Sequence, residues 1–206
     1  MARELTAYRA ASFGSPLRVE ASRSAGRFNR PGDAPTQYLA FHPLGPLAEM
    51  IRAEDLRTVD DLREFRMRTW ALRVDVEPFV EIDFAVADSY RITPDELVSD
   101  DHDACRNLAF TLRGAGVLGL IVPSAALPGT RNLVIFGERI AAGYLDDPVD
   151  PLLDVPASMT AGSAQAPDSL LELVRFRGMQ HSALLAWHSG QPFDFAEPDW
   201  SFQGSG

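Results

Sequence analysis

Residues 26–49 constrain this chain most, because they set a turn, a strand and the start of a helix in direct succession. Residues 31–33, Pro-Gly-Asp, are a turn signal, and the strand-like residues 37–41 follow them. Residues 44–52 then carry apolar side chains at helical spacing. Side chains from these three elements can therefore meet in one cleft.

Four polar residues carry the candidate chemistry. Arg27 precedes the turn, Tyr38 lies on the strand, and Glu49 lies at the edge of the apolar face of the helix. Ser124 follows the apolar run 117–122, which predicts a buried strand. Taken singly, each has an ordinary explanation as a surface ion pair, a core strand residue, a solvated helix residue or a strand cap.

The remaining elements follow from periodicity and helix-start signals. We expect one more buried strand at residues 132–136, after a loop. Further strands are predicted at residues 5–10, 70–76 and 79–87, and helices at residues 59–66, from Thr93, at 102–112 and at 168–176.

Charge excludes one class of partner. The chain has 206 residues with 29 acidic and 19 basic side chains, a formal net charge of -10. An acidic surface of this kind repels nucleic acid, so direct DNA binding is not expected. All 19 basic residues are arginine, so anions must be bound by arginine or by backbone N–H groups. No apolar run is long enough to cross a membrane and no secretory leader is recognisable, which predicts a cytoplasmic protein.

Several other kinds of site are not expected. The single cysteine, Cys105, lies on a predicted helix and is read as a buried structural thiol. The histidines have no metal-ligand spacing, and we expect no metal. Ser124 lacks the GxSxG elbow of a serine hydrolase, and no glycine-rich nucleotide loop is present. The four histidines are His42, His102, His181 and His188.

Composition divides the chain in two. Residues 1–145 form the predicted catalytic domain, and residues 146–206 form a C-terminal extension that begins with aspartate, proline and small residues. The extension is expected to pack on the domain or on a partner. Its aromatic tail, Phe193–Trp200, is a candidate for part of a partner interface.

The ordered set of residues resembles the RES domain family, which is named for its arginine, glutamate and serine. The matching residues are Gly26-Arg27-Phe28-Asn29, Pro31-Gly32, Tyr38, Glu49 eleven positions later, Pro123-Ser124 and the strand that begins at Asn132. The resemblance covers roughly residues 5–136. It departs from the family in a slightly longer segment between Pro31 and Tyr38, and in Ala25-Gly26 where the family often has two glycines.

The resemblance implies an α+β fold similar to ADP-ribosyltransferases, with mixed sheets flanked by helices in a single domain. It also implies a toxin that cleaves the nicotinamide–ribose bond of NAD+, with phosphate as a possible co-substrate and no prosthetic group. Arg27, with Arg9, is expected on the phosphates and Tyr38 against the nicotinamide or its ribose. Glu49 is expected to stabilise the cationic transition state and Ser124 to hydrogen-bond the substrate. Asn29 is also placed among the NAD-binding residues.

Two alternatives stay open beside NAD+ phosphorolysis or hydrolysis. One is a protein ADP-ribosyltransferase toxin, and the other is an inactive module that binds NAD+. The family also implies an inhibitory partner, an antitoxin of the Xre helix-turn-helix type.

Overall fold

A mixed β-sheet forms the centre of the computed structural model, which describes residues 3–10, 24–65, 67, 69–137, 145–148 and 166–198. Within these residues the strand order is β4-β5-β6-β2-β1-β3-β7. β4 and β5 run parallel, whereas all other neighbouring strands are antiparallel. The strands are β1 (Glu4–Ala10), β2 (Thr36–Ala40), β3 (Thr69–Asp75), β4 (Val80–Glu81), β5 (Gly119–Pro123), β6 (Arg131–Phe136) and β7 (Leu145–Pro148).

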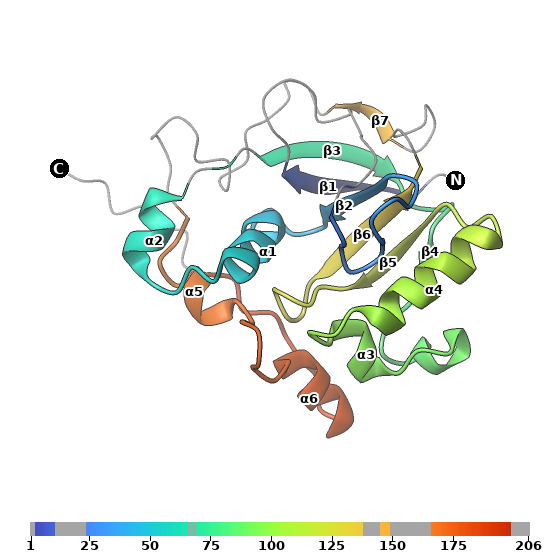
Figure 1. The fold of residues 1–206 in the computed structure, drawn as a ribbon. Coiled ribbons are helices and arrows are strands. Elements are labelled where there is room, and N and C mark those ends of the chain that lie inside the picture. Colours follow the sequence, from blue (N-terminus) through green and yellow to red (C-terminus); the bar gives the residue numbers. More distant parts are fainter. Residues whose placement is uncertain are drawn as a thin grey trace.

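Helices flank the sheet in separate groups. Figure 1 shows α3 and α4 beside the strands β4 and β5, with α1, α2 and α5 grouped away from them and α6 between the two groups. The helices are α1 (Gly45–Glu54), α2 (Val59–Glu64), α3 (Pro94–Val98), α4 (Asp103–Gly114), α5 (Leu170–Leu173), α6 (Ser182–His188) and a 3-10 helix, η1 (Ala87–Tyr90). The predicted fold class, α+β with a mixed sheet in a single domain, is confirmed.

Threonine caps begin two of the helices. Thr58 and Thr93 each accept a hydrogen bond from the backbone N–H three residues later, and the acidic side chain at that position accepts one from the threonine N–H. These reciprocal bonds satisfy N–H groups that the first turn of a helix leaves unpaired. The helix starts predicted at both threonines are confirmed.

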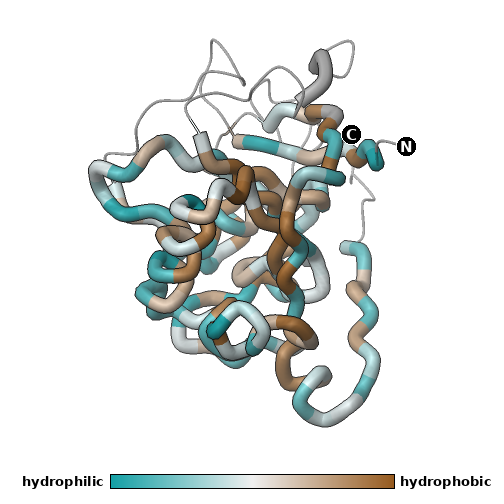
Figure 2. Tube along the Cα trace, turned by 90° about the vertical axis from the view of Figure 1, so that its right-hand side faces the viewer, coloured by the Kyte–Doolittle hydropathy of each residue, from teal (hydrophilic) through white to brown (hydrophobic). Residues whose placement is uncertain are grey.

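Alternation along the strands divides the core between the two sheet faces. Leu120 and Val122 of β5 pack with α3 and α4, whereas Ile121, between them, packs with the apolar residues of β1, β2 and β3 on the other face. Figure 2 shows hydrophobic segments gathered in the middle of the molecule and hydrophilic loops around them. Residues 119–123 are therefore buried on both faces, as their continuous apolar sequence predicts.

The strand predicted at residues 79–87 is wrong over most of its length. Only Val80–Glu81 is strand, and η1 begins at Ala87. The carboxylate of Asp83 accepts hydrogen bonds from the N–H groups of Ala85 (2.9 Å) and Val86 (3.1 Å). This local turn captures donors that a sheet would need, and it ends the strand.

Residues 166–198 pack on the domain. Leu170 and Val174 join the apolar cluster of α1, and Leu184 of α6 joins the cluster of α3 and α4. The tail residue Phe195 stacks edge-on against His42 at 4.9 Å. The described part of the aromatic tail thus contacts its own domain, while Trp200 lies outside the described residues; the boundary at residue 145 stays a prediction.

None of the helices formed by the described residues is both long and apolar enough to span a membrane.

Candidate functional site

A cavity of about 260 Å³ lies on the helix-covered face of the sheet. Its wall is made by α1, β2, the neighbouring ends of β5 and β6, the loop that carries Arg27, and the start of α4. The polar residues that line it are Arg27, Tyr38, Glu49, Arg52, His102 and Asn132.

The loop that carries Arg27 is held by two arginines of α4. Arg106 donates from Nε to the Gly26 carbonyl (3.0 Å), and Arg113 donates to the Ala34 carbonyl (3.1 Å). Both contacts join residues about eighty positions apart in the sequence. The loop is therefore fixed to a helix at both ends.

The Arg27 guanidinium is anchored by one of its two terminal nitrogens. Its Nη1 donates to the carbonyl of Ser99 (2.7 Å), just after α3, and to the carbonyl of Leu97 (3.3 Å), in the last turn of α3. Its Nη2 is buried and has no hydrogen-bond partner among the described residues. Burying such a donor without a hydrogen bond costs free energy, which an acceptor that reaches Nη2 would recover. The Arg27 charge also acts on the buried Cys105 thiol, and it opposes the rise in the Cys105 pKa that burial causes.

Tyr38 exposes its ring and encloses its hydroxyl. The side chain is 39 % exposed, but the hydroxyl donates to Asn29 Oδ1 (2.8 Å) and accepts from the Phe28 N–H (2.9 Å). Burial of the hydroxyl raises the pKa of Tyr38 to about 12, so the phenol stays neutral. A Cβ at Gly26 would lie 2.5 Å from this hydroxyl, which explains the glycine before Arg27.

The Glu49 carboxylate is held by two uncharged donors. Asn132 donates from Nδ2 to Oε1 (2.8 Å), and the Ser124 hydroxyl donates to the same oxygen (3.4 Å). Ser124 itself is fully buried and accepts from the Leu127 N–H (3.1 Å). The Oδ1 of Asn132 is buried without a hydrogen-bond partner among the described residues.

Arg52 adds a second guanidinium to the cavity. It lies one turn after Glu49 on α1 and pairs with Asp100, while its Nε is buried without a hydrogen-bond partner in the described part of the chain. Burial, together with the nearby Arg27 charge, lowers the pKa of Arg52. Arg27 and Arg52 therefore give the cavity a positive side.

His102 stands beside these arginines at the start of α4. Burial lowers the pKa of His102 to about 4, and the positive charges of Arg27, Arg106 and Arg52 contribute in the same direction. The imidazole is therefore neutral near pH 7 and adds a polar group without adding charge.

The predicted site residues take different positions. Arg27, Tyr38 and Glu49 line the cavity together. Ser124 lies behind Glu49, and Asn29 lies behind Tyr38, so both contact a cavity residue and not the cavity itself.

Arg9 was expected on the phosphates, but the structure places it on the opposite face of the sheet. It donates to Gln37 Oε1 (3.2 Å), and Gln37 points away from the face of its neighbour Tyr38. The register that pairs Tyr8 with Ala40 sets this orientation.

Sequence reasoning missed three cavity residues, Arg52, His102 and Asn132. Arg52 follows Glu49 at helical spacing, and Asn132 is a polar residue at the start of an apolar strand, so both carried a local signal. His102 carried none.

These groups combine a fixed carboxylate, an exposed aromatic ring and two guanidinium groups with unpaired N–H donors. Such a site can bind an anion at one side and stabilise a developing positive charge at the other. Among the described residues, no group of three or more His, Cys, Asp or Glu side chains is arranged to hold a metal ion.

Comparison with known proteins gives a fold and a family. A chain in the crystal structure of the M. tuberculosis MbcT-MbcA toxin-antitoxin complex is similar, with a TM-score of 0.57 and 23 % identity over 70 % of this chain and 81 % of that chain. At this identity the likeness shows a common fold. A search of curated proteins found no match. The family model of the RES domain matches residues 6–158, which is most of the sequence, and the chain therefore belongs to the RES domain family.

Proposed function

We propose that this protein is an enzyme that consumes NAD+ by cleaving the bond between nicotinamide and ribose. One observation carries the proposal: Glu49 is fixed by Asn132 (2.8 Å) and Ser124 (3.4 Å) in the same cavity in which Arg27 and Arg52 hold unpaired N–H donors. NAD+ presents both matching groups, a cationic nicotinamide ribose and an anionic pyrophosphate.

The size of the cavity suggests how the substrate binds. A volume of about 260 Å³ lies just below the roughly 300–1,000 Å³ of complete small-molecule sites. The cavity therefore suits the nicotinamide ribose half of NAD+, with the adenosine half outside. Arg27 and Arg52 then contact the pyrophosphate, and the exposed Tyr38 ring packs against nicotinamide or its ribose.

The reaction breaks the C1′–N bond, and the electron pair leaves with neutral nicotinamide. The ribose becomes an oxocarbenium-like cation, which the fixed Glu49 carboxylate stabilises. An acceptor oxygen then bonds to C1′ from phosphate, which gives phosphorolysis, or from water, which loses a proton and gives hydrolysis. A protein side chain as acceptor would make the enzyme an ADP-ribosyltransferase.

The structure suggests a modified role for Ser124. Its hydroxyl donates to Glu49 and it is fully buried, so we assign it to positioning the carboxylate instead of contacting the substrate. Asn29 likewise positions Tyr38 through its hydroxyl.

We further propose that the protein is the toxin of a toxin-antitoxin pair. Membership of the RES domain family and the fold shared with a chain of the MbcT-MbcA complex support this role. The expected partner is a helix-turn-helix antitoxin of the Xre type, which would bind DNA for the complex because this chain carries a net charge of -10. Expression of the chain alone should stop bacterial growth, and co-expression of such a partner should restore it.

The direct test is nicotinamide release from NAD+ by the purified protein, with and without phosphate. Glu49→Gln keeps the shape of the side chain and removes its charge, so turnover should fall about 100-fold or more. Glu54→Gln makes the same charge change at the exposed end of α1 and is the matched control.

Phosphate-dependent release would identify a phosphorylase, and release without phosphate a glycohydrolase. Modified protein bands from labelled NAD+ would identify a protein ADP-ribosyltransferase. If folded protein binds NAD+ without releasing nicotinamide under any of these conditions, the enzyme proposal is wrong and the chain is a binding module.

A further inference from the structure

Residues 175–181 join α5 to α6 and contact both sides of the cavity wall. Arg175 donates from its backbone N–H to the Ala126 carbonyl (2.8 Å), and His181 donates from Nε2 to the Ser124 carbonyl (2.9 Å). Both acceptors belong to the loop after β5. This loop carries the hydroxyl that bonds to Glu49.

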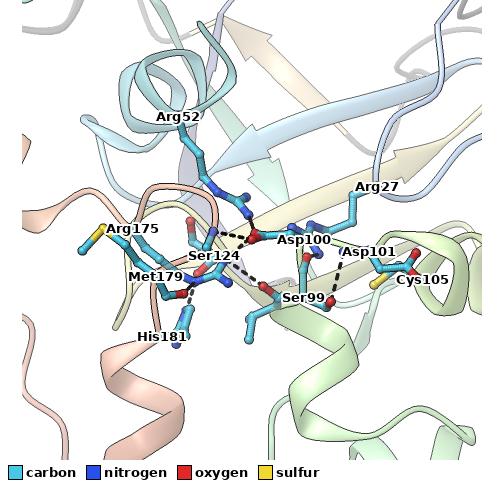
Figure 3. A network of polar contacts seen from close by, with 12 residues as sticks. Arg27, Arg52, Ser99, Asp100, Asp101, Cys105, Ser124, Arg175, Met179 and His181 are labelled. Carbon is cyan, nitrogen blue, oxygen red and sulfur yellow. Dashed lines mark hydrogen bonds and ion pairs between the residues drawn. The ribbon is translucent and has the colours of Figure 1, made fainter. Parts of the chain in front are cut away.

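The same segment holds the loop between α3 and α4. Arg175 donates from Nη1 to the Val98 carbonyl (3.0 Å) and to Asp100 (3.1 Å), and Gly178 donates its N–H to Asp100 (2.7 Å). Figure 3 shows Asp100 between Arg175 on one side and Arg52 on the other. Asp100 is therefore the link between residues 175–181 and a cavity arginine.

The segment has a defined shape of its own. Arg175 Nε donates to the Met179 carbonyl (2.9 Å), and His181 Nδ1 accepts from the Leu184 N–H (3.2 Å), which caps α6. Since Nδ1 accepts, the proton of the neutral imidazole must be on Nε2, the atom that faces Ser124. Arg175 is 9 % exposed and His181 is 4 % exposed.

Asp100 is held as a charged group. Burial opposes its ionisation, but the Gly178 N–H and the Arg175 and Arg52 guanidinium groups outweigh that effect and lower the pKa of Asp100. A neutral side chain at this position would leave two guanidinium groups without their shared anion.

We infer that residues 175–181 are a brace that positions the site, with His181 acting on Ser124 and Asp100 acting on Arg52 as positioning residues. The changes in kcat and KM that this inference predicts rest on the proposed function, because both are measured as NAD+ turnover. The brace lies outside residues 6–158, the part of the chain that matches the RES domain, so the family match does not assign it.

Two replacements of His181 separate positioning from simple stabilisation. His181→Asn retains an acceptor near Nδ1 for the helix cap and loses the donor to Ser124, whereas His181→Gln retains a donor near Nε2 and loses the cap. We expect kcat for nicotinamide release to fall about 10-fold in His181→Asn and to stay within about twofold in His181→Gln, because a displaced catalytic group costs turnover. Each variant loses one hydrogen bond, so both should lower the melting temperature.

A second readout does not depend on turnover. The Leu127 N–H donates to Ser124 Oγ, and its hydrogen exchange should become about 10-fold faster in His181→Asn but not in His181→Gln. If wild-type protein releases no nicotinamide, the proposed function fails and this exchange comparison still decides the brace. Equal effects of the two variants on kcat and exchange, or no effect of either, would overturn the role of His181.

Asp100→Asn tests the second contact, in which Asp100 links residues 175–181 to Arg52. We expect the KM for NAD+ to rise about 10-fold with kcat changed less than twofold, because Arg52 loses a charge-assisted bond. Asp95→Asn makes the same charge change at an exposed ion pair with His188 and should leave KM unchanged. NAD+ affinity by calorimetry should follow KM, and unchanged affinity in Asp100→Asn would overturn the role of Asp100.

Discussion

The two sides of the cavity hold their charges in opposite ways. The Glu49 carboxylate is fixed by uncharged donors, the amide of Asn132 and the hydroxyl of Ser124. On the other side, Arg27 is fixed by backbone carbonyls and Arg52 by Asp100, and each guanidinium keeps a buried N–H unpaired. Glu49 has hydrogen bonds to neutral donors, although the charge of Arg52, three residues later on the same helix, acts on it as well. The two guanidinium groups keep N–H groups without a hydrogen-bond partner among the described residues.

This difference predicts different kinetic effects. A carboxylate that opposes a developing cation acts mainly in the transition state, so damage to it should lower kcat. Guanidinium groups that bind phosphates act in the ground state as well, so damage to them should raise KM. The following variants test that division.

The largest effect is expected from Asn132→Leu. The substitution keeps the approximate volume and removes the 2.8 Å bond to Glu49, so kcat should fall about 100-fold while KM changes less than about threefold. Steady-state nicotinamide release measures both constants. Asn107→Leu, at an exposed position of α4, removes a hydrogen bond to Arg30 instead and is the control for loss of an asparagine amide. A change in KM alone would contradict the proposed division.

Arg27→Lys should have an intermediate effect. Lysine keeps the charge but cannot reach two backbone carbonyls and a phosphate with a planar fork, so KM for NAD+ should rise about 10-fold or more. NAD+ titration calorimetry should show the same loss of affinity. Arg63→Lys, half-exposed on α2, should leave both values unchanged. A variant with normal KM and reduced kcat would show that Arg27 acts in the transition state and does not serve mainly to bind the substrate.

Tyr38→Phe should affect stability more than catalysis. The aromatic ring remains, but the Phe28 N–H and Asn29 Oδ1 lose their partner, which should cost about 1–3 kcal/mol of unfolding free energy. Urea unfolding measures the loss, with Tyr90→Phe as the matched control. If NAD+ turnover disappears while the unfolding free energy is unchanged, the hydroxyl takes part in the reaction itself.

A further prediction is a dependence of stability on pH. The pKa of His102 on the arginine side and that of His181 behind Ser124 are both lowered to about 4, mainly by burial. Between about pH 6.5 and 4 the unfolded chain therefore binds protons that the folded protein does not, and the unfolding free energy should decrease as pH falls.

His102→Gln should reduce this dependence, because it removes one of the two histidines. Chemical unfolding at several pH values between 4 and 7 would measure the change. An unfolding free energy that stays constant over this range would contradict the neutral state of both histidines.

Local sequence patterns predicted most of the fold, because caps and apolar periodicity act over a few residues. The error at residues 79–87 arose because the Asp83 carboxylate captures backbone donors, which an apolar pattern does not reveal. Arg27, Tyr38 and Glu49 were predicted together, since one turn, one strand and one helix start deliver them to one cavity.

The rest of the site depends on distant pairing. The face that Arg9 occupies follows from the register of β1 on β2, and a shift of one residue would reverse it. Asn132 meets Glu49 from 83 positions away, and Asp100 joins Arg52 to Arg175 from two other elements. Such contacts are set by tertiary packing, so the apolar periodicity of the sequence does not predict them.

The position of the brace along the chain has a consequence for synthesis. A ribosome produces Arg27, Tyr38 and Glu49 early, and it produces Arg175 and His181 only after the whole sheet. A nascent chain therefore contains every residue of the proposed chemistry before it contains the contacts that place Ser124 and Arg52. If the protein has the NAD+-consuming activity proposed above, that activity would reach its full rate only after residues 175–181 have been made and have packed on the domain.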